Sequence, residues 1–535
     1  MKFDHEVSRL MCVLQEALRP DHQKHLLAII ENEGMEKVLD PELFKAARYF
    51  DRRTLLTFLA SLGFENTKEQ AHYQRWLAAT QYRNGQIDAG EAARLCASER
   101  PLMVDFYRNL LKTLDNPKAE ATWLDWMEMP CTVADMLFAT EFLLDCQVVQ
   151  WLPFVLHRWC QLDNSGEPWL WMYRNVIERV EYAQTVQQSQ VLAQALYMLL
   201  KKVAPEHQSM MNTLTAKLVD LYLRAEQSDQ ALALAQTLLS NSSDLSGTYW
   251  LMRSHANRSQ FSEAIKFASN FLSAVIDKAI KEKMSEDLLF KAQEQPKKKK
   301  DFDVNAANKS LKTVNRILRD RGLQPFLMSG VLLGYMREGQ ILPHDKDIDL
   351  GLIGWEQQFE VAQALLASGR YHVSWRNLRG AKTFLLDAYD MENGVAVDFF
   401  FFHPHSDHFL HGIDYKYGFT QNFRFSPFGL KEIDFLGERF FIPDNAEKNL
   451  VENYGDWKTP QSSYVVTVEA PVLVQKGSEK HQFIALIELM RSVETFNSVK
   501  RVQRILDCCN ALDMHVLSTE LEHRLNDWMV RQALH

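Results

Sequence analysis

Residues 327–352, LMSGVLLGYMREGQILPHDKDIDLGL, decide the fold of the second half of the chain. Ser329 and Gly330 form a small-residue turn after a short apolar run, and a helical pattern follows them. Three aspartates then stand at every second position: Asp345, Asp347 and Asp349. Because alternate residues of a β-strand point to one face of the sheet, this spacing predicts a strand that presents three carboxylates on one side.

Carboxylates this close repel one another, and each pKa rises unless a cation lies among them. Ligand sets made of oxygen alone favour Mg²⁺ or Mn²⁺. A solvated edge strand is the alternative, but apolar residues flank the motif on both sides. We therefore expect a divalent metal site on this strand, with Asp347 and Asp349 as ligands.

A further acidic group is expected from a neighbouring strand. Asp398 lies in the run VAVDFFFF, where one charge among aromatic residues needs a partner. The longer stretch TFLLDAYDMENGVAVDFFFF is typical of a β-hairpin around the tight-turn dipeptide Asn393-Gly394. We expect Asp398 to complete the metal site, and a core ion pair with an arginine is the alternative.

The Ser-Gly turn also predicts a phosphate site. Backbone N–H groups of Ser329 and Gly330, at the start of a helix, can hold phosphate oxygens with the help of the helix dipole. Arg337 could add a bidentate contact. Three cations ahead of the hairpin are further phosphate candidates, with a solvated loop as the alternative: Arg376, Arg379 and Lys382.

The whole chain sets outer limits on fold and function. Its 535 residues predict two or three domains, and its net charge of −9 supplies no basic field for nucleic acid. Seven scattered cysteines without a CxxC pair favour a reducing, cytoplasmic compartment. The N-terminus lacks a signal-peptide pattern. The most apolar window, residues 133–156, is interrupted by acids, so no transmembrane segment is expected.

Residues 1–290 follow a helical period, and glycine and proline are sparse in them. Within them, residues 229–239 align with residues 262–272 at an offset of 33, with small residues at equivalent positions. Residues 82–95 add a fainter unit. A period near 34 is typical of tetratricopeptide-like helical hairpins, and a generic helical bundle is the alternative.

The quoted motif resembles the LicD/fukutin family of the nucleotidyltransferase superfamily. Its members carry a glycine turn, an LLG element, an arginine, a proline and then alternate aspartates, as this chain does. Residues 425–457 are also similar and close on a YG-x-W element. The resemblance covers residues 303–460, and Val331 departs from it, because many members carry a hydroxyl residue there.

The resemblance implies a metal-dependent phosphotransferase. It implies transfer of phosphocholine, ribitol phosphate or glycerol phosphate from a CDP-activated donor to a surface glycan or its lipid-linked precursor, with release of CMP. Asp347 and Asp349 would be the metal pair, supported by Asp345. Asp398 would be the third ligand or the general base that draws the proton from the acceptor hydroxyl.

Several interpretations stay open. Tyr454 and Trp457 would wall a nucleotide or acceptor pocket, or serve structural packing. Four histidines could bind zinc, contact a glycan or phosphate, or belong to a solvated loop, which is the favoured interpretation: His403, His405, His408 and His411. The competing functions are a nucleotidyltransferase that moves NMP onto a small molecule, protein or RNA, and a non-catalytic helical scaffold. The intact acids argue against the scaffold.

The predicted fold is therefore multidomain, with four parts. These are an all-helical, tetratricopeptide-like region at 1–290, a linker at 291–302, an α/β nucleotidyltransferase-fold catalytic domain with a mixed sheet at 303–475, and a helical segment at 476–535. The first part would hold the acceptor or a protein partner. We expect a cytoplasmic protein, and contact of the linker lysines with anionic lipid at the inner membrane is an alternative.

Overall fold

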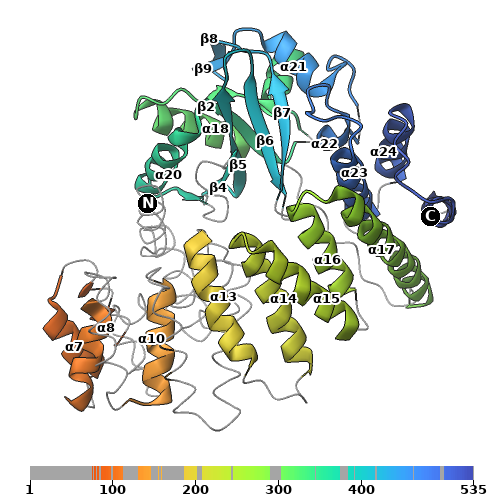
Figure 1. The fold of residues 1–535 in the computed structure, drawn as a ribbon. Helices are drawn as coiled ribbons and strands as arrows, with labels where there is room; N and C mark the ends of the chain where they lie inside the picture. The colour runs from red at the N-terminus through yellow and green to blue at the C-terminus, as the bar shows by residue number, and fades with distance from the viewer. Residues whose placement is uncertain are drawn as a thin grey trace. The chain divides into compact units, whose positions relative to one another are not determined.

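The computed structural model (Figure 1) describes parts of residues 75–158 and, with short gaps, residues 186–289 and 303–533. The predicted linker at 291–302 lies outside these residues. The chain divides into two compact units, residues 1–217 with 365–380 and residues 218–364 with 381–535. The second unit contains the predicted acids and the Ser329-Gly330 turn.

The first unit is mainly helical where it is described. Its elements are α7 (Ala89–Ala97), a 3-10 helix (Pro101–Met103), α8 (Val104–Lys112), α10 (Val133–Asp145) and α13 (Val186–Leu200), with β3 (Tyr371–Val373) also grouped here. Asp135 is buried but satisfied, since its carboxylate accepts hydrogen bonds from Tyr107 Oη at 2.6 Å and Thr132 N at 2.8 Å. Within the described ranges, no helix has both the length and the apolar content needed to cross a membrane.

Two helical hairpins follow along the chain: α14 (Gln208–Arg224) with α15 (Ser228–Asn241), and α16 (Ser246–Asn257) with α17 (Phe261–Leu289). Their turns repeat at the offset of 33 found in the sequence. Glu226 and Ser259 adopt left-handed φ angles of 59° and 58°. The next residue in each turn donates a backbone hydrogen bond five residues back, over 2.8 Å in the first turn and 2.9 Å in the second. Small residues expected at the helix contacts are fully buried: Ala231, Ala235, Ala264 and Ala268.

The second unit contains a mixed sheet, as predicted. Its strands are β1 (Phe326–Leu327), β2 (Asp347–Ile353), β4 (Leu385–Asp390), β5 (Val395–Pro404), β6 (Phe409–Tyr415), β7 (Phe419–Phe425), β8 (Leu430–Phe435) and β9 (Glu438–Pro443). The main path runs β4-β5-β2-β1-β9-β8, and the β6–β7 hairpin branches from β5. β2 is parallel to β5 and β1 is parallel to β9, while β4 is antiparallel to β5.

The predicted hairpin around Asn393-Gly394 is confirmed as β4 and β5. Asp390, which is fully buried, accepts hydrogen bonds from Glu392 N and Asn393 Nδ2, both at 3.1 Å, and so closes the turn through its side chain. Gly394 takes a φ of 74°, which glycine adopts without steric cost. The turn fixes the register that places Asp387 opposite Asp398.

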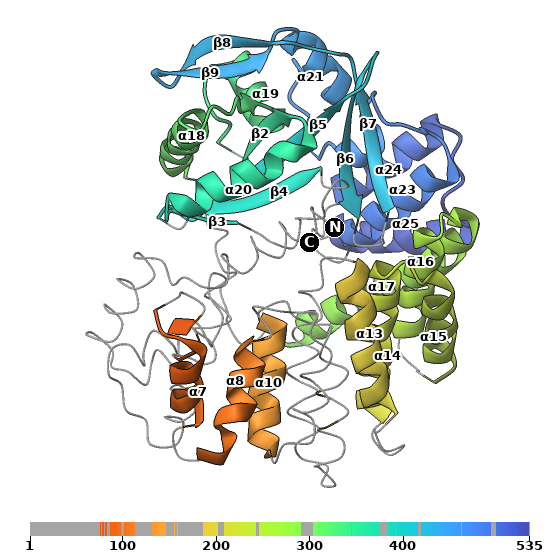
Figure 2. The same ribbon diagram turned by 60° about the vertical axis from the view of Figure 1, so that its left-hand side comes forward.

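Helices pack on the sheet and position the site. α18 (Val304–Arg319) begins at an Asp303 side-chain cap and packs against β2 and β5. α19 (Ser329–Glu338) follows β1 after one residue and packs against β2 and α21 (Ala446–Tyr454), as Figure 2 shows. A 3-10 helix (Trp355–Gln357) and α20 (Gln358–Ala367) follow β2. The predicted strand–turn–helix order around Ser329 is thereby confirmed.

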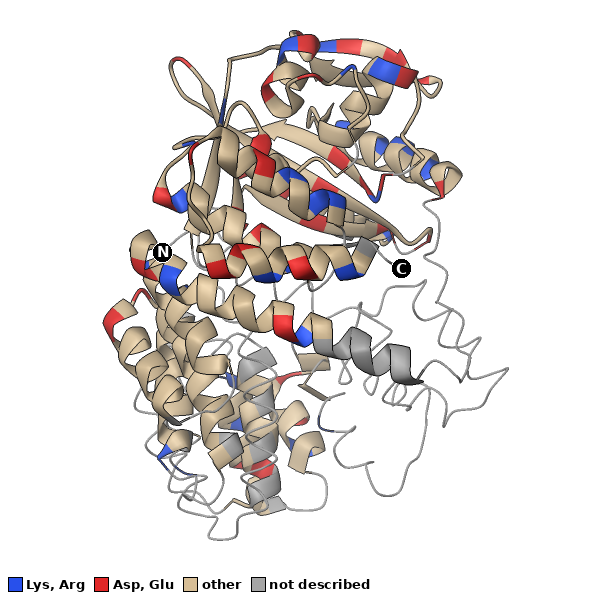
Figure 3. Ribbon diagram, turned by 90° about the vertical axis from the view of Figure 1, so that its right-hand side faces the viewer, with Lys and Arg blue, Asp and Glu red and all other residues tan. Residues whose placement is uncertain are grey.

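The C-terminal segment is helical, as predicted: α22 (Val466–Glu469), α23 (Glu479–Arg491), α24 (Val499–Ala511) and α25 (Thr519–Ala533). These helices share one apolar core with α16 and α17. From α17, Leu272 and Ile276 are fully buried in it, together with Phe483 of α23 and Trp528 of α25. In Figure 3, acidic and basic residues are interspersed along the helices.

Candidate metal and phosphate site

Asp347, Asp349 and Asp398 converge at the centre of the sheet. Residue Asp349 on β2 lies directly opposite Asp398 on the parallel strand β5. Each of the three side chains offers one carboxylate oxygen, and these oxygens lie within 4.8 Å of one another. The expected meeting of acids from two separate segments is therefore present in the structure.

Asp345 is placed differently from the expectation that it would share the strand. β2 begins at Asp347, so Asp345 lies ahead of the strand, where the alternation of side chains does not apply. It faces the Ser-Gly turn instead, because a Cβ added to Gly330 would lie 2.3 Å from Oδ2 of Asp345. A side chain at position 330 would require the carboxylate of Asp345 to move away from the turn.

Gly330 also fixes Asp349. Its backbone N–H donates a hydrogen bond of 2.9 Å to Oδ2 of Asp349. The N–H that the sequence assigned to a phosphate therefore holds a carboxylate in this structure. The neighbouring Ser329 adopts a φ of 44°, which is uncommon for a residue with a side chain and typical of functional turns.

The electrostatics of the three acids disfavour their ionised forms. Burial, and then Asp347, Asp345 and Asp398, raise the pKa of Asp349 well above its ordinary value, while the hydrogen bond from Gly330 opposes that rise. Burial also raises the pKa of Asp347, against the effect of Lys346. Burial, Asp387 and Asp347 raise the pKa of Asp398 to about 8. A cation among these oxygens would reverse the penalty.

The donor set fits a hard divalent cation. It consists of carboxylate oxygens alone, it is largely enclosed, and it carries excess negative charge. Among the acids, histidines and cysteines of the described residues, these three aspartates are the group whose ligand atoms lie close enough to share one metal ion.

Asp387 is a fourth acid that the sequence reasoning did not single out. It stands on β4 directly opposite Asp398, and it contributes to the raised pKa of that residue. The hairpin register could have predicted this position, because pairing Asp390 with Val395 places Asp387 opposite Asp398. β2, β5 and β4 thus each bring an acid to one row across the sheet.

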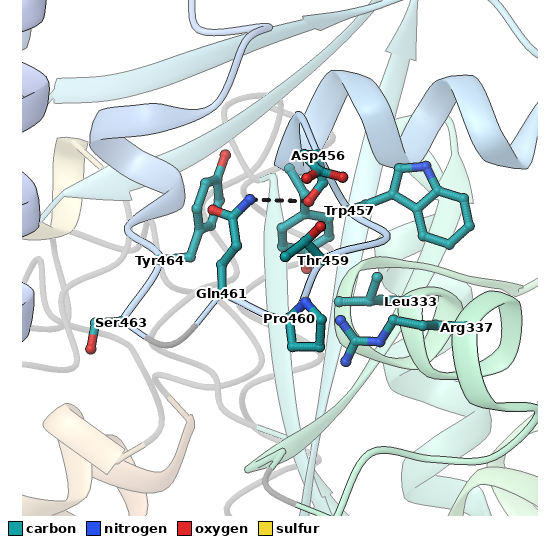
Figure 4. Close-up of a pocket in the computed structure, with 10 residues that line it drawn as sticks. Leu333, Arg337, Asp456, Trp457, Thr459, Pro460, Gln461, Ser463 and Tyr464 are labelled. Atoms are coloured by element: carbon teal, nitrogen blue, oxygen red, sulfur yellow. Dashed lines mark hydrogen bonds between the residues drawn. The ribbon is translucent and has the colours of Figure 1, made fainter.

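A cavity of about 550 Å³ opens beside the Ser329-Gly330 turn (Figure 4). It contains three of the predicted binding residues, Arg337, Tyr454 and Trp457, with Leu333 and residues of the segment 456–464. Figure 4 shows Leu333 and Arg337 projecting from a helix toward Pro460. The Nε of Arg337 is buried and has no hydrogen-bond partner among the described residues.

Tyr454 connects the cavity to the acids. Its hydroxyl has a side-chain hydrogen bond with Ser329 that opposes the rise of its pKa, while burial, Asp349 and Asp345 raise that pKa strongly. Tyr454 therefore lies within the field of the acidic cluster while it lines the cavity. Arg376, Arg379 and Lys382 lie outside the described residues, so their predicted phosphate contacts stay predictions.

The four histidines are not a group whose ligand atoms converge on a metal within the described residues. His405 and His408 stack with their ring centroids 4.6 Å apart, and His408 contacts Asp407. His411 is buried instead among aromatic rings, stacked on Phe402 with ring centroids 5.0 Å apart. The solvated-loop alternative therefore does not describe His411.

Burial of His411 predicts a loss of stability in acid. Burial lowers the pKa of His411 from 6.5 to about 4. Between these values the unfolded chain binds a proton that the folded chain does not, so the folded state is destabilised as the pH falls from 6.5 toward 4. We expect this residue to remove about 3 kcal/mol over that range. The pH dependence of urea unfolding should be correspondingly flatter in His411→Phe, and an unchanged slope would contradict the assignment.

Comparison with known proteins places this sheet in a family. Residues 322–445 match the family model described as "LicD/FKTN/FKRP, nucleotidyltransferase domain". Residues 322–445 form a LicD/fukutin-family domain. The matched segment carries β1, the Ser-Gly turn and the five acids described above: Asp345, Asp347, Asp349, Asp387 and Asp398.

Two relatives of this LicD/fukutin-family domain carry the name Ribitol-5-phosphate transferase FKTN. The one from Mus musculus is 27% identical over 157 residues, covering 29% of this chain and 33% of the relative. The one from Homo sapiens is 26% identical over 162 residues, covering 30% and 34%. Uncharacterized protein RT0683 of Rickettsia typhi is 22% identical over 201 residues, covering 37% and 62%. The chain spans about a third of the length of the FKTN relatives.

Proposed function

We propose that residues 303–475 are a nucleotidyltransferase-fold catalytic domain that moves a phosphorylated alcohol from a CDP-activated donor to a glycan acceptor and releases CMP. One observation carries the proposal: carboxylates from β2 and β5 converge beside the Ser-Gly turn of a LicD/fukutin-family domain. The name of the FKTN relatives favours ribitol phosphate among the alcohol phosphates of the family.

Asp347, Asp349 and Asp398 would hold Mg²⁺ or Mn²⁺. The ion, when bound, would neutralise charge on the donor pyrophosphate. Gly330 orients Asp349 through its N–H, and Asp345 supports the turn from the other side. Positioning and charge stabilisation would supply most of the rate enhancement.

The chain's own residues would manage the proton and the phosphates. A carboxylate oxygen of Asp398 would accept the proton of the acceptor hydroxyl as its oxygen bonds to the phosphorus of the alcohol phosphate. The bond from that phosphorus to the CMP oxygen breaks, and CMP leaves. Without metal, burial, Asp387 and Asp347 raise the pKa of Asp398 to about 8, and a bound cation would lower it, so that the carboxylate is ionised and able to accept a proton.

The cavity beside the turn would receive the donor. Arg337 lines the cavity, and its Nη2 pairs with Glu338 at 3.3 Å. Its buried Nε–H has no partner within the described part of the chain and is suited to a phosphate oxygen. Tyr454 and Trp457 would provide aromatic walls for the nucleoside, and Ser329 would offer its hydroxyl at the boundary between cavity and acids. Arg376, Arg379 and Lys382 would add phosphate contacts.

The helical regions would serve recognition. The repeated turns of α14–α15 and α16–α17 support a tetratricopeptide-like organisation within residues 1–290, which would hold the glycan acceptor or a protein partner. The described cysteines are free thiols, which supports a reducing, cytoplasmic setting: Cys96, Cys131, Cys508 and Cys509. Peripheral contact with the inner membrane would fall to the linker lysines.

Nucleotide binding should depend on the metal. We expect CDP to raise the melting temperature of the full chain only when Mg²⁺ or Mn²⁺ is present, because the donor phosphates must otherwise approach an anionic cluster. At a CDP concentration of about 100 times Kd, the added stability should be about 2.7 kcal/mol. Differential scanning fluorimetry with EDTA as the metal-free control measures it.

A donor panel then separates the candidate functions. Mass spectrometry of reactions with CDP-ribitol, CDP-glycerol and CDP-choline should show released CMP. Release of pyrophosphate from a nucleoside triphosphate, with NMP joined to a product, would instead support the nucleotidyltransferase alternative. A chain that no nucleotide stabilises would overturn both enzymatic accounts.

A further inference from the structure

The wall of the cavity is built largely outside the family domain. Eight of its ten lining residues lie within residues 454–464, beyond the matched segment 322–445. Residues 456–461 and 463–464 form no helix or strand, so side-chain contacts contribute to the shape of this wall. Its internal contacts include the 3.0 Å hydrogen bond from Gln461 Nε2 to the carbonyl oxygen of Asp456 (Figure 4).

Arg504, on α24 of the C-terminal helices, contacts two side chains of this wall and one side chain just after it. Its Nε donates to both carboxylate oxygens of Glu469 at 2.7 Å, and its Nη2 donates to Oε1 of Gln461. Its guanidinium lies 5.2 Å from the ring centroid of Tyr464. Two of these partners, Gln461 and Tyr464, line the cavity.

Tyr464 in turn contacts Tyr454. The ring of Tyr464 lies 5.5 Å from the ring of Tyr454, and its hydroxyl donates to the carbonyl oxygen of Asn453 at 2.8 Å. Glu469 also accepts a hydrogen bond from Val465 N at 2.8 Å, which holds the chain just after the wall. A continuous set of contacts thus runs from Arg504 through Tyr464 to Tyr454, which is coupled to Ser329.

We propose that Arg504 is a positioning residue for donor binding, so that the C-terminal helices are an integral part of the nucleotide pocket. The inference rests on the proposed function and deepens it by naming what shapes the pocket. Arg504 itself is not among the lining residues, so it acts through Gln461 and Tyr464. A planar guanidinium presents a fixed fork of donors that can bridge a carboxylate and an amide while its face lies against an aromatic ring, and a lysine ammonium lacks that fork and that planar face.

Arg501 provides a matched control on the same helix. It donates to Glu488 Oε2 at 2.9 Å and to Ser492 Oγ at 3.2 Å, and neither partner lines the cavity. Removing either guanidinium deprives a glutamate on a neighbouring helix of its partner. Loss of Arg504, unlike loss of Arg501, also removes contacts with Gln461 and Tyr464 in the cavity wall.

The test measures CDP binding to the full chain by isothermal titration calorimetry in Mg²⁺. We expect Arg504→Gln and Arg504→Lys to raise the Kd of CDP about tenfold, and Arg501→Gln to leave it within about twofold. Mn²⁺ binding without nucleotide should be equal in all four proteins, because the acidic trio is untouched. Gln461→Ala should weaken CDP binding too, and combining it with Arg504→Gln should add less than the sum of the single effects.

The outcomes separate the two proposals. If the wild-type chain binds CDP and Arg504→Gln binds it equally well, the positioning role is wrong while the proposed function stands. Full binding by Arg504→Lys with loss in Arg504→Gln would show that charge, and not the bridging geometry, matters, and would also overturn the role stated here. A wild-type chain that binds Mn²⁺ but no nucleotide overturns the proposed function, and this inference with it.

Discussion

Asp349→Asn should abolish transfer and yet leave the metal-free protein at least as stable as the wild type. Replacing the carboxylate with an amide removes the most buried ligand of the trio, and metal-site charge stabilisation is worth several kcal/mol. We therefore expect a fall in turnover of about 10³-fold or more. Release of CMP from the productive donor, followed by mass spectrometry, is the measurement.

The stability half of this prediction follows from the raised pKa. Asp349 is ionised only at a cost in the metal-free protein, since burial and three neighbouring carboxylates oppose its charge. An asparagine keeps an oxygen for the Gly330 N–H and carries no charge. The melting temperature in EDTA should therefore stay level or rise, and the stabilisation by Mg²⁺ should vanish.

Asp434→Asn is the matched control, because Asp434 is an exposed acid on β8 whose ion pair with Arg439 spans 3.4 Å at the protein surface. It should retain full turnover and full stabilisation by metal. Full activity in Asp349→Asn would remove the acidic trio from the mechanism. A large drop in its metal-free melting temperature would show that the ionised carboxylate supports the fold.

Removal of the N-terminal helices should unfold the helical core of the second unit. A chain that starts at residue 303 lacks α17, whose Leu272, Val275 and Ile276 are buried against the C-terminal helices. Each such side chain contributes about 1.5–3 kcal/mol through burial, so the three together supply roughly 5–9 kcal/mol. This is comparable to the whole net stability of a domain, about 5–15 kcal/mol. Circular dichroism should show loss of helix and of a sharp thermal transition.

A chain that starts at residue 208 is the control, because it keeps both helical hairpins from α14 to α17. It should melt close to the full-length protein. If the shorter chain melts at the same temperature, the apolar core shared with α17 does not support the C-terminal helices. The design also bears on acceptor recognition, since a truncation at 303 would lose activity through unfolding and could not test that role.

The local parts of the site were predictable because strand periodicity and turn chemistry act over a few residues. The aspartate alternation correctly placed Asp347 and Asp349 on one strand, and the Asn393-Gly394 turn correctly announced the hairpin that carries Asp398. Asp345 escaped the pattern because the strand starts two residues later. The alternation of residue types shows which side chains share a face of a strand, but it does not show at which residue the strand begins.

Tertiary contacts were beyond the reach of the pattern. Nothing in the local sequence shows that Gly330 N–H turns toward Asp349, or that Arg504 reaches Gln461 across 43 positions. The same holds for α17, whose apolar face is typical of any amphipathic helix until its partners on α23 and α25 are known. The sequence gives the identity of each of these residues, but their contact partners depend on the tertiary fold.

The main path of the sheet ends at β8, and this outermost strand carries three charged residues, Lys431, Glu432 and Asp434, among its six. Glu432 pairs with Arg439 at 3.0 Å, so charge also lines the neighbouring strand. An incoming strand from another molecule would have to strip water from these groups before it could add to the ladder. The charges on β8 therefore oppose edge-to-edge pairing of two molecules along this strand.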